Sequence, residues 1–183
     1  MKQNNLKTRS MVLCALFAAL TAVCSQIQIA LPMVPINLAL FAVHIAGALL
    51  GAKYGSISLI VYTVLGAVGV PVFAGFTGGL GILFGKTGGY IIGYILAAFL
   101  VGFLSKKWGF SFAKLCLSMT VGLLACYLFG TLWFMLVVGS GLITTLGWCV
   151  FPFLPGDVIK ILLAALVTVK LRKAFVQNGW IND

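Results

Sequence analysis

Long apolar runs, separated by short polar or glycine-rich stretches, dominate the chain. Six segments carry this apolar character, residues 10–31, 37–50, 55–70, 87–104, 112–138 and 156–171. Because about 20 apolar residues span the hydrocarbon core of a bilayer, the pattern predicts a bundle of six transmembrane helices. The second and third segments are shorter than a full span, so the loops beside them must complete the crossing, whereas the fifth is long enough to tilt.

The composition excludes a soluble protein. Of the 183 residues, 62% are hydrophobic and only 8% are charged, and the mean hydropathy is +1.19. No soluble domain of this size could bury so much apolar surface. We therefore expect an all-α integral membrane protein that forms one membrane domain over residues 1–183.

The N-terminal segment is open to a second interpretation. Lys2, Lys7 and Arg9 precede an apolar run, as in a secretory signal peptide. The run reaches Leu31, which is too long for such a signal, and Val23 stands before Cys24 where a lipoprotein cleavage site needs Gly or Ala. We interpret this segment as a retained first transmembrane helix.

Three stretches between the helices are irregular. Residues 32–36 contain two prolines and predict a stiff connector, while residues 73–86 and 139–154 are rich in glycine and aromatic side chains. Irregular backbone at membrane depth must pack on protein or line a cavity, because lipid cannot satisfy its hydrogen bonds. The two long loops are therefore expected to cover or line a site.

Basic residues predict the orientation of the bundle. With both termini in the cytoplasm, ten of the twelve basic residues fall at cytoplasmic segment ends. Only Lys86 then lies outside, and Lys160 lies within the membrane. The net charge of +10 therefore indicates the topology of the bundle and a weak affinity of the protein for anionic lipid. It does not indicate a surface that binds nucleic acid. The irregular stretches converge on the outer side.

Few residues could perform catalysis or hold a metal. Glutamate is absent, and His44, the only histidine, lies in the middle of a segment and is interpreted as a satisfied residue of the bundle interior. Residues 81–87 resemble a P-loop, but Leu80 stands where that motif requires its first glycine. The spacing of the five cysteines fits no metal site or disulfide framework. We expect no enzyme activity, no metal and no cofactor.

Asp157 and Lys160 stand out in the last segment. Asp157 is one of two acidic residues in the chain, the other being Asp183. Ionisable groups inside a membrane segment are costly and mark a functional site by default. Three interpretations remain open: Asp157 caps the helix, it pairs with Lys160 three residues on, or the two side chains bind one ligand.

The first segment carries a stripe of small residues, Ala15, Ala18, Ala19 and Ala22. Small residues four apart allow helices to approach closely. The stripe either packs inside the bundle or forms a docking face for another membrane subunit.

The chain resembles the BioY family, the biotin-binding S components of energy-coupling factor (ECF) transporters. The resemblance runs almost end to end. Its stretches are the alanine-rich first segment, Val34-Pro35-Ile36, residues 66–73, residues 85–93 and residues 155–160. In this order, on six helices, they form a specific combination.

The resemblance implies a vitamin-binding subunit in a prokaryotic cell membrane. It would take up biotin with a transmembrane coupling subunit and two ATPase subunits, and Ala15 and Ala19 would face the coupling subunit. Asp157 would accept hydrogen bonds from the ureido group of biotin and Lys160 would bind its carboxylate, or the two ends would be exchanged. Tyr90 and Asn37 would add polar contacts. Relatives carry a polar residue at the position of Ala39, and alanine cannot make such a contact.

Three alternatives to this function remain. The chain could be a stand-alone facilitator or channel for small solutes, or an S component for another vitamin. A purely structural membrane subunit, with Asp157 and Lys160 as a buried ion pair, is a third.

Overall fold

The computed structural model describes residues 2–31, 33–178 and 180, with backbone alone for residues 2–7. Pro32 of the predicted connector lies outside the described residues. The regular secondary structure of these residues is helical apart from one short antiparallel pair of strands, in which Gln28 pairs with Asn37 and Ile29 with Ile36. The elements are α1 (Lys2–Gln26), β1 (Gln28–Ile29), β2 (Ile36–Asn37), α2 (Ala39–Ala67), α3 (Leu80–Leu83), α4 (Gly88–Trp108), α5 (Phe112–Val138), α6 (Leu142–Cys149) and α7 (Leu154–Gln177).

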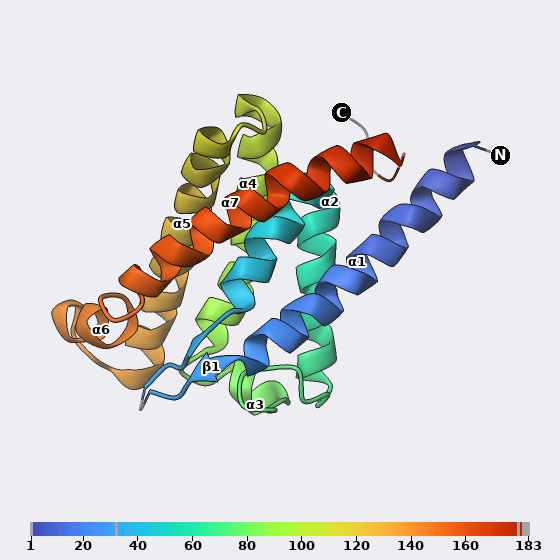
Figure 1. Cartoon of the computed structure of the whole chain (residues 1–183). Coiled ribbons are helices and arrows are strands. Elements are labelled where there is room, and N and C mark those ends of the chain that lie inside the picture. The colour runs from blue at the N-terminus through green and yellow to red at the C-terminus, as the bar shows by residue number, and fades with distance from the viewer. Residues whose placement is uncertain (1, 32, 179, 181–183) are drawn as a thin grey trace.

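Helix α2 is a hairpin of two antiparallel arms. Its helical geometry is interrupted at Gly51, where φ is 75° and ψ is 176°. A Cβ atom on Gly55 would lie 2.9 Å from the Cα atom of Gly47, whereas residues eight apart in a straight helix are separated by about 12 Å. The chain therefore reverses at Gly51, and Figure 1 shows the first arm rising to this turn and the second descending from it. The arms correspond to the predicted segments 37–50 and 55–70.

The membrane class of the fold agrees with the sequence. Among the described residues, four helices are long and apolar enough to cross a bilayer when α2 is counted once. Helices α6 and α7 form a pair bent by 53°, which gives a fifth if the pair is one span. The all-helical architecture is therefore confirmed. The count of six crossings stays a prediction, because it treats the two arms of α2 as separate spans.

Several helix limits differ from the predicted ones. Helix α6 occupies residues 142–149 inside the stretch expected to be irregular, and α1 begins at Lys2, ahead of residue 10. Helix α7 begins at Leu154, ahead of Gly156, with Pro155 in its first turn. Proline is tolerated there, because its missing N–H has no partner within the helix in any case.

Glycines let the central helices approach closely. Helix α4 is the most enclosed of the spans, with 61% of its apolar window buried. A Cβ atom on Gly102 would lie 2.3 Å from the backbone nitrogen of Ala52 at the α2 turn. Another on Gly122 of α5 would lie 2.6 Å from the Val101 side chain. Helix α4 is thus held between α2 and α5 by contacts that only small residues allow.

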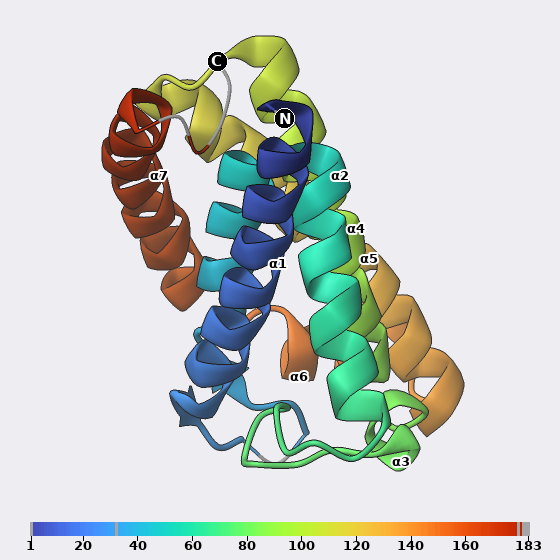
Figure 2. The ribbon, with the colours of Figure 1, turned by 90° about the vertical axis from the view of Figure 1, so that its right-hand side faces the viewer.

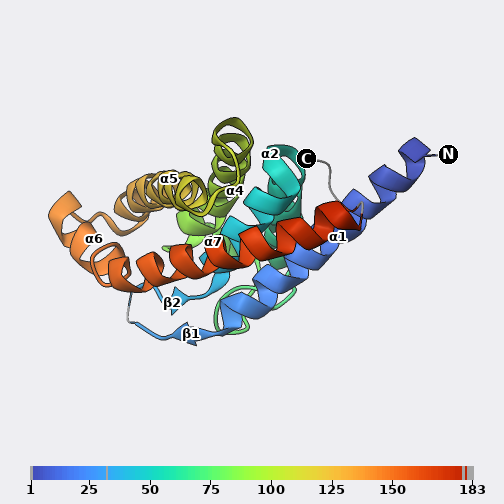
Figure 3. The ribbon, with the colours of Figure 1, turned by 45° about the horizontal axis from the view of Figure 1, so that its top comes forward.

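The bundle has two unlike ends. Both termini lie at one end, while the strands, α3 and α6 lie at the other (Figures 1 and 2). Helix α7 packs against α2 and α5 and crosses in front of α2 in Figure 3. All the irregular stretches therefore meet at one end, as the sequence predicts, and they enclose the candidate site.

Candidate functional site

A cavity of about 300 Å³ opens at the irregular end of the bundle. Cavities of roughly this size, mostly apolar with a few polar groups, are typical of small-molecule sites. Its wall combines residues from the strand connection, α2, the loop before α4, α4 itself, α5 and the α6–α7 region. The polar and aromatic members are Asn37, Tyr62, Phe73, Thr77, Lys86, Thr87, Tyr90, Tyr94, Tyr127, Phe153, Asp157 and Lys160.

Asp157 and Lys160 form a buried ion pair on the first turns of α7. The Nζ atom of Lys160 lies 2.7 Å from Oδ1 of Asp157. The two residues are only 2% and 7% exposed. Their spacing of three positions places both on one face of the helix. The ion-pair interpretation is confirmed, and both groups also line the cavity.

The capping interpretation of Asp157 is wrong. Helix α7 begins at Leu154 and its cap residue is Phe153, whose side chain makes no capping bond. The backbone N–H of Asp157 donates to the carbonyl of Phe153 at 2.9 Å. Asp157 is already inside the helix, so its carboxylate is available to partners from other elements.

Tyr127 is the site residue that the sequence did not reveal. It lies on α5, and its hydroxyl donates a hydrogen bond to Oδ2 of Asp157. Both carboxylate oxygens of Asp157 therefore have a donor within the protein. In the sequence Tyr127 is one aromatic residue in a long apolar run, and nothing in that run distinguishes it from a residue facing lipid. Only the packing of α5 against α7 identifies it.

Tyr90 and Asn37 reach the same cavity from two other elements. Tyr90 is 8% exposed, and its hydroxyl lies 3.4 Å from Oγ1 of Thr131. Its ring packs on Gly130, where an added Cβ atom would lie 2.3 Å from the ring. Oδ1 of Asn37 accepts a bond from the N–H of Ala39 at 3.0 Å. The structure thus brings all four residues predicted to bind substrate around one cavity.

The loop between α2 and α4 forms one wall, and its first part is anchored to α1 and α2. Phe73 packs edge-on against Tyr62, with ring centroids 5.5 Å apart, and the Gly79 N–H donates to the Gly66 carbonyl at 2.7 Å. Gln26, at the end of α1, donates to the Phe73 carbonyl at 3.1 Å and accepts from the Phe76 N–H at 2.8 Å. These contacts tie the loop to α1 and α2 beside the cavity.

His44 differs from its interpretation as a satisfied residue. It is fully buried in the first arm of α2, but neither ring nitrogen has a hydrogen-bond partner among the described residues. It lies one turn beyond Leu40, which lines the cavity, and is not itself part of the wall. Within the described part of the chain no group of three or more possible metal ligands occurs.

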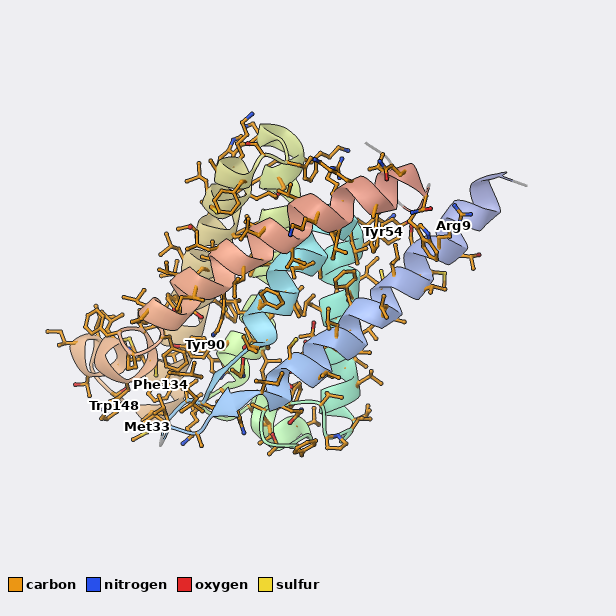
Figure 4. All side chains as sticks on the ribbon, viewed as in Figure 1. Arg9, Met33, Tyr54, Tyr90, Phe134 and Trp148 are labelled. Carbon is orange, nitrogen blue, oxygen red and sulfur yellow. The ribbon has the colours of Figure 1, made fainter. Side chains whose placement is uncertain are left out.

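The alanine stripe of α1 divides between two faces. Ala18 is buried in the core, while Ala15 and Ala19 are exposed beside the exposed Leu16 and Leu20. Figure 4 shows α1 at the edge of the bundle, with Arg9 and Tyr54 at the end away from Tyr90, Phe134 and Trp148. Ala15 and Ala19 therefore remain available to another molecule.

Known proteins are similar to this chain in both sequence and fold. The model of the BioY family matches residues 1–177. A probable biotin transporter BioY of Pyrococcus horikoshii is 40% identical, over 91% of this chain and 98% of its own. The biotin transporter BioY of Thermotoga maritima is 38% identical, over 93% and 99%. The crystal structure of an S component for biotin from an ECF-type ABC transporter superposes with a TM-score of 0.85 at 31% identity, covering 93% of this chain and 94% of that one.

Proposed function

This chain belongs to the BioY family, and from that premise we propose that it is the substrate-binding S component of an ECF transporter and binds biotin for uptake. Family membership agrees with the resemblance seen in the sequence and with a transport subunit, not an enzyme. The observation that carries the proposal is a mostly apolar cavity with one buried ion pair in its wall.

The chemistry of the cavity suits biotin. Biotin has a ureido ring with two N–H donors and one carbonyl acceptor, an apolar thioether ring and an aliphatic chain that ends in a carboxylate. A carboxylate and an ammonium group in a dry wall form strong, charge-assisted hydrogen bonds with such groups. We assign Asp157, Lys160, Tyr90 and Asn37 to the binding of biotin, with the 73–86 loop as the cover of the site.

Uptake needs partners, because the chain has no nucleotide-binding motif. A transmembrane coupling subunit and two ATPase subunits would supply the energy. The exposed Ala15 and Ala19 offer a surface on which a second membrane helix can approach closely. The protein would lie in the cell membrane as six crossings, with both arms of α2 counted, with its termini in the cytoplasm and its cavity opening outward.

The direct test is equilibrium binding of biotin to the purified chain. We expect one tight site per chain. Loss of one charge-assisted contact, in Asp157→Asn or Lys160→Ala, should weaken binding about tenfold to a hundredfold. Unchanged affinity in both variants would refute the site, and a wild-type chain that binds no biotin would refute the function. Accumulation of biotin in cells that lack every coupling and ATPase subunit would instead support a self-sufficient carrier.

A further inference from the structure

A second hollow lies on the surface of the bundle, over one face of α4 between α5 and the second arm of α2. It has a volume of about 450 Å³ and is lined by Ser56, Ile92, Ile95, Leu96, Phe99 and Phe129. It shares no residue with the cavity assigned to biotin. We propose that this groove binds one anionic phospholipid, with an acyl chain in the groove and the phosphate on Lys53 and Lys106.

The groove has the shape and polarity of a site for an acyl chain. From Ile92 to Phe99 it follows about 10 Å of a membrane-spanning helix, and all its lining side chains except that of Ser56 are apolar. Leu96 and Phe99 are exposed, so the groove opens toward lipid. A chain that enters it exchanges contacts with other lipids for contacts with protein, which gives no hydrophobic gain. The groove therefore selects shape, and the choice of headgroup must come from polar groups beside it.

Two lysines lie beyond one end of the groove. On the second arm of α2, Lys53 comes one helical turn before Ser56, and on α4, Lys106 comes two turns after Phe99. Each lysine therefore shares a helix face with a residue of the groove wall. The two helices meet here, because an added Cβ atom on Gly102 would lie 2.3 Å from the backbone of the α2 turn. Both lysines are exposed.

The charge at this end of the bundle calls for an anion. Asp157 is the only acidic residue of the described part of the chain, and it is buried in its ion pair with Lys160 at the cavity end. The α2 turn and the C-terminal end of α4 lie at the opposite end, with the termini (Figure 2). No carboxylate of the described residues therefore neutralises Lys53 or Lys106. Anionic headgroups are attracted to lysines at this depth, and the predicted topology places them in the cytoplasmic leaflet.

The order of groups along the groove matches that of a phospholipid. The lysines correspond to the phosphate, the apolar wall to the chain, and Ser56 lies between them at the level of the ester groups. The Ser56 hydroxyl has no hydrogen-bond partner among the described residues. A change of its χ1 rotamer would turn this hydroxyl toward an ester oxygen, which can accept its hydrogen bond.

A second copy of the chain fits the groove less well. In one membrane two copies have the same orientation, so a second copy would bring its own lysines to the same leaflet. Like charges would then meet without a carboxylate of the described residues to separate them. A lipid phosphate has the opposite sign, so charge complementarity favours the lipid.

Native mass spectrometry of the purified chain tests the headgroup site. The probes are dioleoyl phosphatidylglycerol, which is anionic, and dioleoyl phosphatidylcholine, which has the same chains and no net charge. We expect one phosphatidylglycerol per chain, bound about tenfold more tightly than phosphatidylcholine. Lys53→Gln/Lys106→Gln should weaken phosphatidylglycerol about tenfold to thirtyfold. The control Lys170→Gln/Lys173→Gln removes two exposed lysines of α7, which lies on the other side of α2 from α4 and α5 (Figure 2), and should match the wild type.

A second pair of variants tests the groove. Leu96→Trp should fill it and weaken phosphatidylglycerol about fivefold or more. Leu163→Trp, at an exposed position of α7 outside the groove, is the matched control and should leave lipid binding unchanged. Thermal unfolding of all four variants, with midpoints equal to that of the wild type, shows that the fold is intact.

Several results would overturn the inference. Equal affinity for the two lipids would mean ordinary contact with the bilayer. An equal loss in both double lysine variants would mean that net charge alone attracts the lipid. Unchanged binding in Leu96→Trp would place the lipid elsewhere, and a dimer that retains no lipid would show that a second copy covers the groove. The site does not depend on the proposed function, because a chain that binds phosphatidylglycerol here but no biotin would refute only that function.

Discussion

The carboxylate of Asp157 is held inside a membrane segment by two donors from the same protein. Lys160 neutralises one of its oxygens and Tyr127 donates to the other. A buried pair of this kind contributes little net stability, since desolvation of the two charges offsets their attraction. Removing one partner is different, because the other charge is then buried without compensation.

We expect Lys160→Met to lower the free energy of unfolding by about 3–5 kcal/mol, because it leaves Asp157 unpaired. The double variant Asp157→Asn/Lys160→Met should recover most of this loss, since no buried charge remains. Unfolding in mixed detergent micelles, followed by circular dichroism, measures both. Lys106→Met, at an exposed position, is the control for loss of a lysine. A double variant as unstable as Lys160→Met would contradict the argument.

Gly130 sets the position of the Tyr90 ring. An added Cβ atom would lie 2.3 Å from the ring, so Gly130→Ala should push the ring toward the cavity. We expect a loss of about 1–3 kcal/mol in stability, as for other overpacked cores, together with weaker biotin binding. In α6, Gly147 has no atom within 4 Å of its added Cβ, and Gly147→Ala is the matched control. Equal effects of the two substitutions would argue against steric control of Tyr90.

At the scale of elements, the turn within α2 determines how the bundle is built. The sequence predicts two short segments, 37–50 and 55–70, but not their close antiparallel pairing at Gly51. The backbone there has φ 75° and ψ 176°, a region that is accessible essentially to glycine alone. Gly47, Gly55 and Gly102 surround the turn without side chains to separate the backbones.

Gly51→Ala should therefore destabilise the protein by about 1–3 kcal/mol through backbone strain alone. No atom lies within 4 Å of an added Cβ at this position, so a steric clash does not contribute. Gly81 also has open space but no positive φ, and Gly81→Ala should be close to neutral. Thermal unfolding of both variants in one detergent compares their stabilities. If Gly51→Ala does not change the stability, the turn relaxes to accept the side chain.

At the scale of the whole molecule, the bundle is polarised. Both termini lie at one end, and the cavity with its covering loops lies at the other (Figure 2). Most of the lysines and arginines at the ends of the predicted segments belong to the same end of the bundle as the termini. An S component that takes up substrate from outside must present the cavity end to the exterior, which agrees with the positive-inside rule.

This orientation predicts the accessibility of single cysteines in a variant that lacks the five native ones. Phe84 is 69% exposed beside the cavity, and Lys106 is exposed at the other end of α4. A membrane-impermeant maleimide should label Phe84→Cys in intact spheroplasts and Lys106→Cys only after permeabilisation. The opposite pattern would invert the topology.

The sequence by itself determined the membrane class, the family and the charged pair of the site. These depend on local properties, namely apolar length, basic segment ends and the short spacing of Asp157 and Lys160 on one helix. The tertiary structure decided which distant residues meet. Tyr127, Lys86 and the partners of Gly51 and Gly130 come from elements far apart in the chain, and contacts between such elements depend on packing geometry that has no local sequence signal. His44 shows the same limit, because its burial was predictable but its lack of a hydrogen-bond partner within the described part of the chain was not.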